Sequence, residues 1–424
     1  MLVPENVTVA DYNAALATEE VTHARITFIL DNIVFQDTEI EQGGIQLSTY
    51  MNPDDNMSFG TAYSTEATIR LLRSEKTDSV NFAHEFTVEF GVEIGGDIEW
   101  VTVGHFTGEK PIQTITSDIV ELIAYDKMVR FDKRADDFIS RLTFPCTLAD
   151  IYDELCDFVV LDHVAGDEIA SVMAEQYTSA DSFDFASCRE ILSCIAEANG
   201  CYAKMTADGK VQLVWFGDHT ADQSLLLANC FSGNIIKLEK SYSKKWAILD
   251  GKQWKDLESV KYSEYDDSEN PFSYSYMRFL WTKDNEEKDI YQPAYDPYHN
   301  NRLWANVENY QWIFVENMQW KELETKDDLA GNTYTISDNP FLLHSTDADI
   351  KAHLQYILDN LELFNLHYVA SVTMTGNWLI EPGDVVLLEI QSGTFIEYPI
   401  FNRTLKWNGI CECYYETTGS LKQE

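Results

Sequence analysis

Histidine and cysteine are the side chains best suited to bind a transition metal or to act as a catalytic base or nucleophile. The chain has nine histidines, which are scattered without an HExxH pair, and eight cysteines. Cys188, Cys194 and Cys201 lie six and seven residues apart, and Cys411 and Cys413 flank one glutamate. Neither set has the CxxC spacing of a structural zinc site. We therefore predict no metal site.

Motifs that bind phosphate or activate a serine are also absent from the sequence. It contains no GxSxG elbow, no glycine-rich phosphate loop and no dinucleotide fingerprint. The pairs Gly43-Gly44 and Gly95-Gly96 lack the residues that would continue such a motif, and they indicate turns instead. We predict no cofactor-binding residue.

Adjacent carboxylates, such as Asp54 with Asp55 or Asp266 with Asp267, are the remaining candidates for acid–base chemistry. A glycosidase needs two carboxyl groups at a defined distance in space, about which adjacency in sequence says nothing. Solvated loop charges are the favoured interpretation of these pairs. We predict no catalytic residue and no enzymatic activity, and a cell-wall hydrolase stays the weaker alternative.

Four tryptophans in the second half of the chain could stack on sugar rings, because aromatic rings pack on the apolar faces of ligands. The favoured interpretation is that they anchor a core or a subunit interface. A carbohydrate-binding receptor module is therefore a second alternative. The four residues are Trp281, Trp304, Trp312 and Trp320.

The net charge of the chain argues strongly against a protein that binds the phosphates of nucleic acid. Lys and Arg number 30 against 71 Asp and Glu, which gives a formal net charge of −41. Such a charge keeps a protein soluble, or it forms a surface past which DNA slides without adhering. With 424 residues, 45% of them hydrophobic, the chain is long and apolar enough for two or three folded domains.

No targeting or membrane signal is visible at the beginning of the sequence. The first 20 residues have neither a basic start nor an apolar segment. No apolar run approaches the ~18 residues that span a bilayer. We expect synthesis in a reducing cytoplasm, with free and mostly buried thiols, and no membrane insertion by this chain.

The elements that would position any site begin with β-structure. After an N-terminal arm at 1–20, polar and apolar residues alternate in short runs throughout 21–133, as in HEFTVEFGVEI. This period of two, with turn residues between the runs, predicts antiparallel strands.

Helical patterns then take over within residues 134–228. Thr147 and Asp150 indicate the start of one helix, and Ser187 with Glu190 indicates a second. The second helix should end at Gly200, and a hairpin should follow it around the turn Ala207-Asp208-Gly209. These features predict an α/β insert domain.

Strands return in the last part of the chain, 229–424. Residues 251–330 are aromatic and acidic without a clear period, which indicates an insertion of loops and edge strands. Apolar spacing behind Thr346 predicts a helix at 347–363. Later strands are separated by turns at Pro382-Gly383 and Asn408-Gly409.

Three stretches together resemble the central hub proteins of phage tail tips and baseplates, a group that shares its hub region with the tail-associated lysins of phages of Gram-positive bacteria. The first stretch is VGHFTGEKPIQTITSDIVELIAYDKMVRFDK, which contains Ala124 to Met128. The second starts with Pro145 to Leu148 and continues in REILSCIAEANGCYAKMTADGKVQLVWF. The third is GNWLIEPGDVVLLEI with YPIFNRTLKWNGICECYYETTG. They occur in the order of the family.

The resemblance implies a mainly β (α+β) fold, in which two tube-like β-barrel domains, 21–133 and 229–424, enclose the α/β insert. Three copies would form a ring of pseudo-sixfold symmetry, a structural part of the virion made in the bacterial host cytoplasm. Its implied partners are the tail tube or distal tail protein, a central spike or tip protein, and the C-terminus of the tape-measure protein. DNA would pass through the ring without specific binding. In tail-associated lysins an enzyme follows the hub region, and we expect none before Glu424.

The resemblance gives two pairs of residues structural roles. Gly383 and Asp384 should form a tight turn before a strand. Tyr125 and Asp126 should close the first barrel against the insert.

Overall fold

The computed structural model divides the chain into two compact units, 1–235 with 338–353 and 370–424, and 236–337 with 354–369. The residues that the structure describes are 2–18, 22–51, 59–109, 111–113, 118–164, 176–180, 183–214, 223–225, 230–237, 277–283, 286–291, 332–336, 339–343, 346–361, 368–375, 377–391, 393–409 and 411–416.

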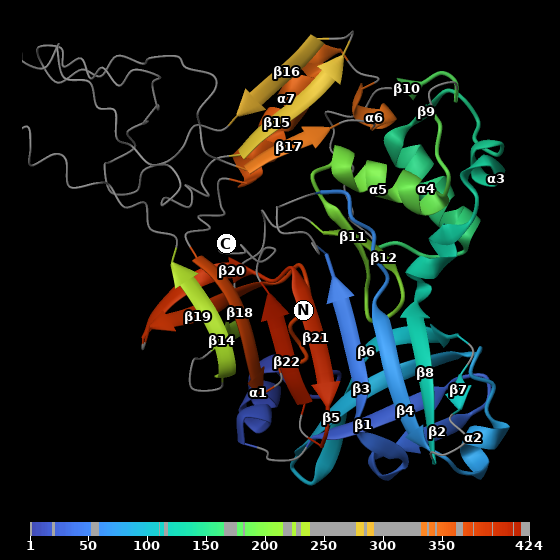
Figure 1. The fold of residues 1–424 in the computed structure, drawn as a ribbon, viewed down its shortest axis with the longest axis vertical. Coiled ribbons are helices and arrows are strands. Elements are labelled where there is room, and N and C mark those ends of the chain that lie inside the picture. The colour runs from blue at the N-terminus through green and yellow to red at the C-terminus, as the bar shows by residue number, and fades with distance from the viewer. Residues whose placement is uncertain are drawn as a thin grey trace, which may run out of the picture. The chain divides into compact units, whose positions relative to one another are not determined.

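A sheet of twelve strands is the main element of the first unit (Figure 1). Its order is β14-β18-β22-β21-β3-β4-β8-β6-β5-β1-β2, with β7 paired to β8, and neighbours from β18 to β2 pair antiparallel. The strands are β1 (His23–Phe28), β2 (Ile33–Gln36), β3 (Ile40–Tyr50), β4 (Glu66–Leu72), β5 (Glu85–Ile94), β6 (Asp97–Gly108), β7 (Ile112–Gln113), β8 (Ile119–Asp126), β14 (Cys230–Lys237), β18 (Tyr368–Thr375), β21 (Asn402–Trp407) and β22 (Cys411–Glu416).

The pairing of β21 with β3 joins the two ends of the sequence. Its register runs from Asn402 opposite Tyr50 to Trp407 opposite Ile45. The strands expected in two separate β domains therefore share one sheet, and the predicted mainly β (α+β) class is confirmed. Among the described strands β14 and β2 are the two ends of this sheet, so closure into barrels stays a prediction.

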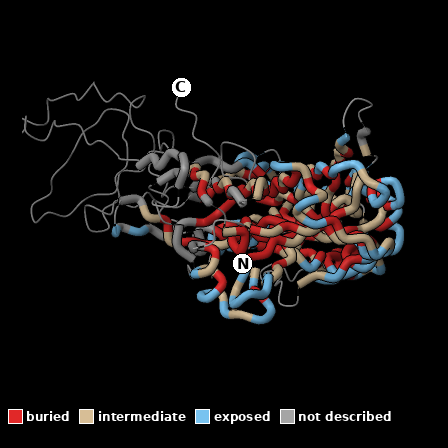
Figure 2. Tube along the Cα trace, turned by 90° about the horizontal axis from the view of Figure 1, so that it is seen from below, coloured by how far each residue is buried: buried red, intermediate tan, exposed pale blue. Residues whose placement is uncertain are grey.

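Alternating burial along the strands explains why this sequence forms a sheet. In β8 every second residue is buried, from Val120 through Leu122 and Ala124 to Asp126. Successive side chains of a strand point to opposite faces, so the apolar set of each strand faces one core. Figure 2 shows the buried residues gathered in the interior of the described trace and the exposed ones mostly on its outer turns.

The inserted module lies at one end of the sheet (Figure 1). It contains α3 (Ala135–Ile139), α4 (Leu148–Val159), α5 (Cys188–Ala198), the paired strands β9 (Cys146–Thr147) and β10 (Gln176–Tyr177), and the hairpin of β11 (Tyr202–Met205) with β12 (Val211–Val214). The 3-10 helix η2 (Lys127–Asp132) leads into it from β8.

Helix starts in the module follow the predicted chemistry, with one difference. Asp150 N donates to Thr147 Oγ1 at 3.1 Å, and Thr147 N donates back to the Asp150 carboxylate at 2.8 Å, which confirms the predicted start of α4. At α5, Glu190 N donates to Ser187 Oγ at 3.2 Å, but the Glu190 carboxylate accepts from Ala186 N. The bond back to the Glu190 carboxylate therefore comes from the residue before the predicted cap, Ala186, and not from Ser187.

Two predictions on the glycine pairs have different outcomes. Gly95 and Gly96 form the turn between β5 and β6, as predicted. The expected turn at Gly43-Gly44 is wrong, because both residues lie inside β3, where the register with β4 shifts between Ile40 and Ile45. This irregularity needs glycine at Gly44, since a Cβ there would lie 2.7 Å from the carbonyl oxygen of Arg70.

The remaining described elements of the first unit are two α-helices, a 3-10 helix, a short helix beside α5 and a small sheet. Helix α1 (Val9–Thr18) lies in the predicted N-terminal arm, and its Tyr12 is fully buried. The others are β13 (Gln223–Leu225), β19 (Val385–Gln391) and β20 (Thr394–Pro399), which form a three-stranded sheet, and η1 (Asp37–Glu39), α2 (Glu75–Ser79) and α6 (Pro340–Leu343). None of the described helices is long and apolar enough to cross a bilayer.

The second unit is described in part. Its sheet has the order β16-β15-β17, with β15 (Met277–Lys283) between β16 (Glu286–Tyr291) and β17 (Asn332–Ile336). A central strand in the segment 251–330 corrects the expectation of loops and edge strands there, and the rest of that segment lies outside the described residues. Helix α7 (Asp347–Leu361) confirms the predicted third helix and passes from the first unit to the second after His353.

Candidate functional site at the junction of sheet and inserted module

Two chain segments pass between the sheet and the inserted module, and together we call them the junction: residues 59–65, which lead into β4, and 126–134, which leave β8. The first segment runs beside the module, because Gly60 N donates to Cys201 O and Ala203 N donates to Thr61 O, both at 2.9 Å. Gly60 has a φ of +78° and lies against α5, where a Cβ would come within 2.6 Å of the Glu197 Cβ. Glycine is needed here for both reasons.

Arg189 of α5 connects both segments of the junction. Its guanidinium donates to Ala62 O at 2.5 Å and to Ser64 Oγ at 3.1 Å in the first segment. In the second segment it donates to Met128 O at 3.0 Å and pairs with Asp132 at 2.6 Å. Five N–H donors in one planar group allow a single side chain to make these contacts.

Asp126 makes the corresponding contacts from the sheet. Its carboxylate accepts from Thr65 N at 2.8 Å and from Met128 N at 3.0 Å, so it caps η2 while holding the start of β4. Burial raises the pKa of Asp126 to about 6, and the hydrogen bonds and the charge of Arg189 only partly offset this effect. The predicted packing of Asp126 between the first β segment and the insert matches this position, whereas Tyr125 reaches Glu66 on an exposed part of the sheet.

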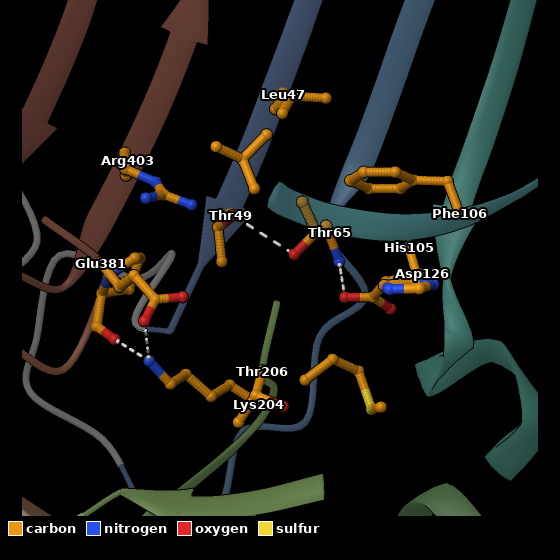
Figure 3. Close-up of a pocket in the computed structure, with 14 residues that line it drawn as sticks. Leu47, Thr49, Thr65, His105, Phe106, Asp126, Lys204, Thr206, Glu381 and Arg403 are labelled. Carbon is orange, nitrogen blue, oxygen red and sulfur yellow. Dashed lines mark hydrogen bonds and ion pairs between the residues drawn. The ribbon is translucent and has the colours of Figure 1, made fainter. Parts of the chain in front are cut away.

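A small pocket with both polar and apolar walls lies where the sheet, the hairpin β11–β12 and the C-terminal strands meet (Figure 3). Thr49 and Thr65 share a hydrogen bond of 3.2 Å on its wall. The lining residues are Leu47, Thr49, Thr65, Val103, Gly104, His105, Phe106, Asp126, Lys204, Met205, Thr206, Glu381, Pro382 and Arg403.

Lys204 and Glu381 form a buried ion pair on one side of this pocket. Their charged atoms are 3.8 Å apart, and Lys204 Nζ also donates to Pro382 O at 2.9 Å. Burial by itself raises the pKa of Glu381, but the charges of Lys204 and Arg403 contribute to a net lowering. The pair therefore links the inserted hairpin to the segment before β19 as two ions.

Arg403 of β21 holds the same segment from the other side. Its guanidinium donates to Ile380 O at 2.6 Å and to Trp378 O at 3.3 Å. Trp378 is fully buried, and its ring nitrogen donates to the Tyr12 hydroxyl at 3.1 Å. The predicted turn at Gly383 follows with a φ of +98°, which confirms that expectation.

Glu85, His105 and Lys127 form a third charged group beside Asp126. Glu85 accepts from His105 Nδ1 at 2.9 Å and pairs with Lys127 at 3.0 Å. Burial raises the pKa of Glu85, but these two partners outweigh it and hold the pKa below its usual value. Lys127 lies under the hairpin turn, since a Cβ on Gly209 would come within 2.9 Å of its Nζ.

The chemistry of the junction is that of a structural connection. Charged side chains of the junction and of the adjoining pocket bond to backbone groups, to the Ser64 hydroxyl or to opposite charges, and the hydroxyls of Thr49 and Thr65 bond to each other. A catalytic nucleophile needs a base within reach, which in turn needs an orienting group. Among the pocket residues that the structure describes, His105 is oriented by Glu85 but has no recorded hydrogen bond to a hydroxyl or thiol.

The residues weighed from sequence lie elsewhere or outside the described residues. Cys188 is buried in α5, and burial raises the pKa of its thiol to about 11. In the part of the chain that the structure describes, no three His, Cys, Asp or Glu side chains are grouped as metal ligands would be. The predictions of no catalytic, cofactor or metal residue stay predictions.

Of the candidate tryptophans and aspartate pairs, Trp281 is the one that lies among the described residues. Trp281 lies in β15 and is 2% exposed, as expected for a core anchor and not for a sugar-stacking ring. The other three tryptophans and the pairs Asp54-Asp55 and Asp266-Asp267 lie outside the described residues.

Four charged residues beside the junction and the pocket were not predicted from the sequence. Lys204 carried a signal, because it is a single cation within the apolar run of a predicted strand. Arg403 carried a similar signal in FNRTLKW. Neither Arg189 nor Glu381 differs in sequence from a solvated charge, since only the fold brings each to its partners.

Comparison with solved structures defines the class of fold to which this arrangement belongs: the fold of a phage tail protein. The chain is similar to the 43 kDa tail protein of prophage MuSo2 from Shewanella oneidensis, with a TM-score of 0.50 and 12% identity over 94% of this chain and 98% of that chain. A tail protein from Neisseria meningitidis MC58 gives a TM-score of 0.49 at 10% identity, over 94% of this chain and 97% of the other.

Sequence comparison adds no closer assignment. A scan against protein-family models finds no match, and a search of curated proteins finds no relative. The likeness to the Shewanella protein, at 12% identity, shows the fold.

Proposed function

We propose that the chain is a structural hub of a bacteriophage tail tip or baseplate, or of a phage-tail-like particle. In this role it forms a homotrimeric ring that joins the tail tube to a central spike or tip protein and encloses the exit channel for DNA. One observation carries the proposal: β21 and β3 join the N-terminal and C-terminal strands into one sheet, around an inserted module, within a tail-protein fold.

The net charge of −41 supports the passage of DNA through such a ring. A polyanion adheres to a wall only where cations replace its counterions, and an acidic wall has few to offer. The partners in this proposal are two further copies of the chain, the tail tube or distal tail protein, the spike or tip protein and the end of the tape-measure protein.

The proposal also holds that the chain has no enzymatic activity. The bonding of the junction supports this, because its charged side chains serve to connect segments. Incubation of the purified chain with bacterial cell walls should leave their turbidity unchanged, and clearing that depends on one carboxylate would favour the hydrolase alternative.

Light scattering on the purified chain, followed by negative-stain imaging of the same sample, tests the hub. A trimer with an open centre is the expected result. A monomer at micromolar concentration that also fails to form rings when mixed with a tail-tube protein would contradict the proposal. Binding of host surface glycans by that monomer would favour the receptor module.

A further inference from the structure

Two side chains, Asp126 and Arg189, each contact both segments of the junction. Asp126 accepts from Thr65 in one segment and from Met128 in the other. Arg189 donates to Ala62 in the first segment and to Met128 in the second. Separating the module from the sheet at this point would expose all of these groups to water together.

The charges that face Asp126 from neighbouring elements are engaged with other partners. Lys127 of η2 and His105 of β6 both bond to Glu85 of β5, at 3.0 and 2.9 Å. Lys204 of β11 pairs with Glu381.

Arg189, and Arg403 on the other side of the pocket, are engaged in the same way. Arg403 of β21 donates to the carbonyl oxygens of Trp378 and Ile380. Arg189 of α5 pairs with Asp132, and its charge reaches Asp126 without a direct hydrogen bond between them in the described structure. Within the described part of the chain, the direct hydrogen bonds to the buried Asp126 carboxylate come from Thr65 and from the Met128 backbone.

We propose that the junction is a pH-dependent latch, which opens more readily at neutral pH, where Asp126 is a buried anion, and which protonation of this carboxyl locks in mildly acidic solution. This proposal concerns the junction alone and does not depend on the hub assignment. It gives the inserted module a defined point at which it can separate from the sheet.

The direction follows from proton linkage. In the closed junction burial raises the pKa of Asp126 to about 6, whereas opening hydrates the carboxyl and returns its pKa towards the ordinary value of about 4. The state with the higher pKa binds the proton more tightly, so a fall in pH favours the closed junction. We expect the opening equilibrium constant to fall about tenfold between pH 7 and pH 5.

Hydrogen exchange of the full chain, read by mass spectrometry at pH 5, 6 and 7, tests the latch. After correction for the intrinsic rate at each pH, peptides covering 59–66 and 126–134 should open about tenfold less at pH 5 than at pH 7. The variant Asp126→Asn should lose this pH dependence. The matched control Asp150→Asn, at an exposed cap of the same module, should keep it.

Two results would overturn the latch. One is junction opening in the wild-type chain that does not change between pH 5 and pH 7, and the other is an unchanged pH dependence in Asp126→Asn. A direct NMR titration of the Asp126 carboxyl in the wild-type chain decides the matter if the variant does not fold. A midpoint near pH 6 supports the latch, and a midpoint at or below pH 4 excludes it.

Discussion

Asp126 and Asp150 make the same kind of contact in two different regions, the buried junction and the exposed start of α4. Each carboxylate accepts hydrogen bonds near the start of a helix, Asp126 from the backbone of Thr65 and Met128, and Asp150 from Thr147 N and Oγ1. The pKa of Asp126 is raised to about 6 because burial is the largest effect, whereas hydrogen bonds from Thr147 lower the pKa of the exposed Asp150. The comparison teaches that desolvation, and not the number of hydrogen bonds, decides the sign of the shift.

The largest effect on stability is expected from substituting one of two lysines in the hairpin of β11 and β12, the buried Lys204, with the exposed Lys210 as its control. Lys204→Met should lower the free energy of unfolding by about 3–5 kcal/mol, because it removes the cation that pairs with the buried Glu381 carboxylate. Urea denaturation followed by tryptophan fluorescence measures the change. Lys210→Met is the matched control, since Lys210 pairs with Asp208 in solvent and its loss should leave the denaturation midpoint within error of wild type. If both variants lowered the free energy of unfolding equally, the buried and the exposed ion pair would not differ in their contribution to stability.

The pH dependence of stability should separate the two aspartates by sign. Asp126 has a raised pKa in the folded state, so its contribution to stability is full below about pH 4 and is lost as the pH rises through about 6, by about 3 kcal/mol in all. Asp150 has a lowered pKa, so its contribution is present above its unfolded pKa and is lost as the pH falls through its folded pKa. The difference in unfolding free energy between wild type and Asp126→Asn, measured from pH 4 to 7, should follow the first pattern. For Asp150→Asn, whose window lies below about pH 4, the difference should be flat over this range.

A smaller effect is expected at the exposed helix start itself. Thr147→Ala removes the acceptor for Asp150 N and should lower the free energy of unfolding by about 1 kcal/mol. Thr147→Ser keeps the hydroxyl and serves as the control in the same thermal or urea titration. A loss above about 3 kcal/mol would show that this cap is coupled to the core in the way that the junction is.

The smallest predicted effect is a gain in stability at the end of α4. Val160, at the end of α4, is a β-branched residue with a φ of +62° and is 73% exposed. Val160→Gly should relieve the left-handed conformation and raise the free energy of unfolding by about 0.5–1 kcal/mol. Val160→Ala, which keeps a Cβ, should gain less. A clear loss of stability in Val160→Gly would mean that the exposed side chain contributes a contact to the folded chain.

Local elements of the fold were predictable because their causes are local. Alternation of polar and apolar residues predicted the strands, and side-chain caps predicted α4 and α5. The glycine pair in β3 shows the limit of such reasoning. A turn and a bulge both need glycine, and only the position of β4 beside β3 decides between them.

The junction was predictable only in outline. Asp126 was expected between the first β segment and the insert, and its position there agrees. The charge of Arg189 near Asp126 and the pair of Lys204 with Glu381 were not predicted, because they bring together residues separated by 63 and 177 positions respectively. No local pattern specifies contacts over such distances.

The sequence by itself determined the mainly β class, the start of α4 and the strong negative charge, because each depends on neighbouring residues or on sums over the chain. Tertiary structure alone decided that the N-terminal and C-terminal strands share one sheet through β21 and β3, and which charges are buried. The physical reason is that strand pairing and desolvation are long-range properties. A carboxylate such as Asp126 acquires its pKa only when distant segments exclude water from it.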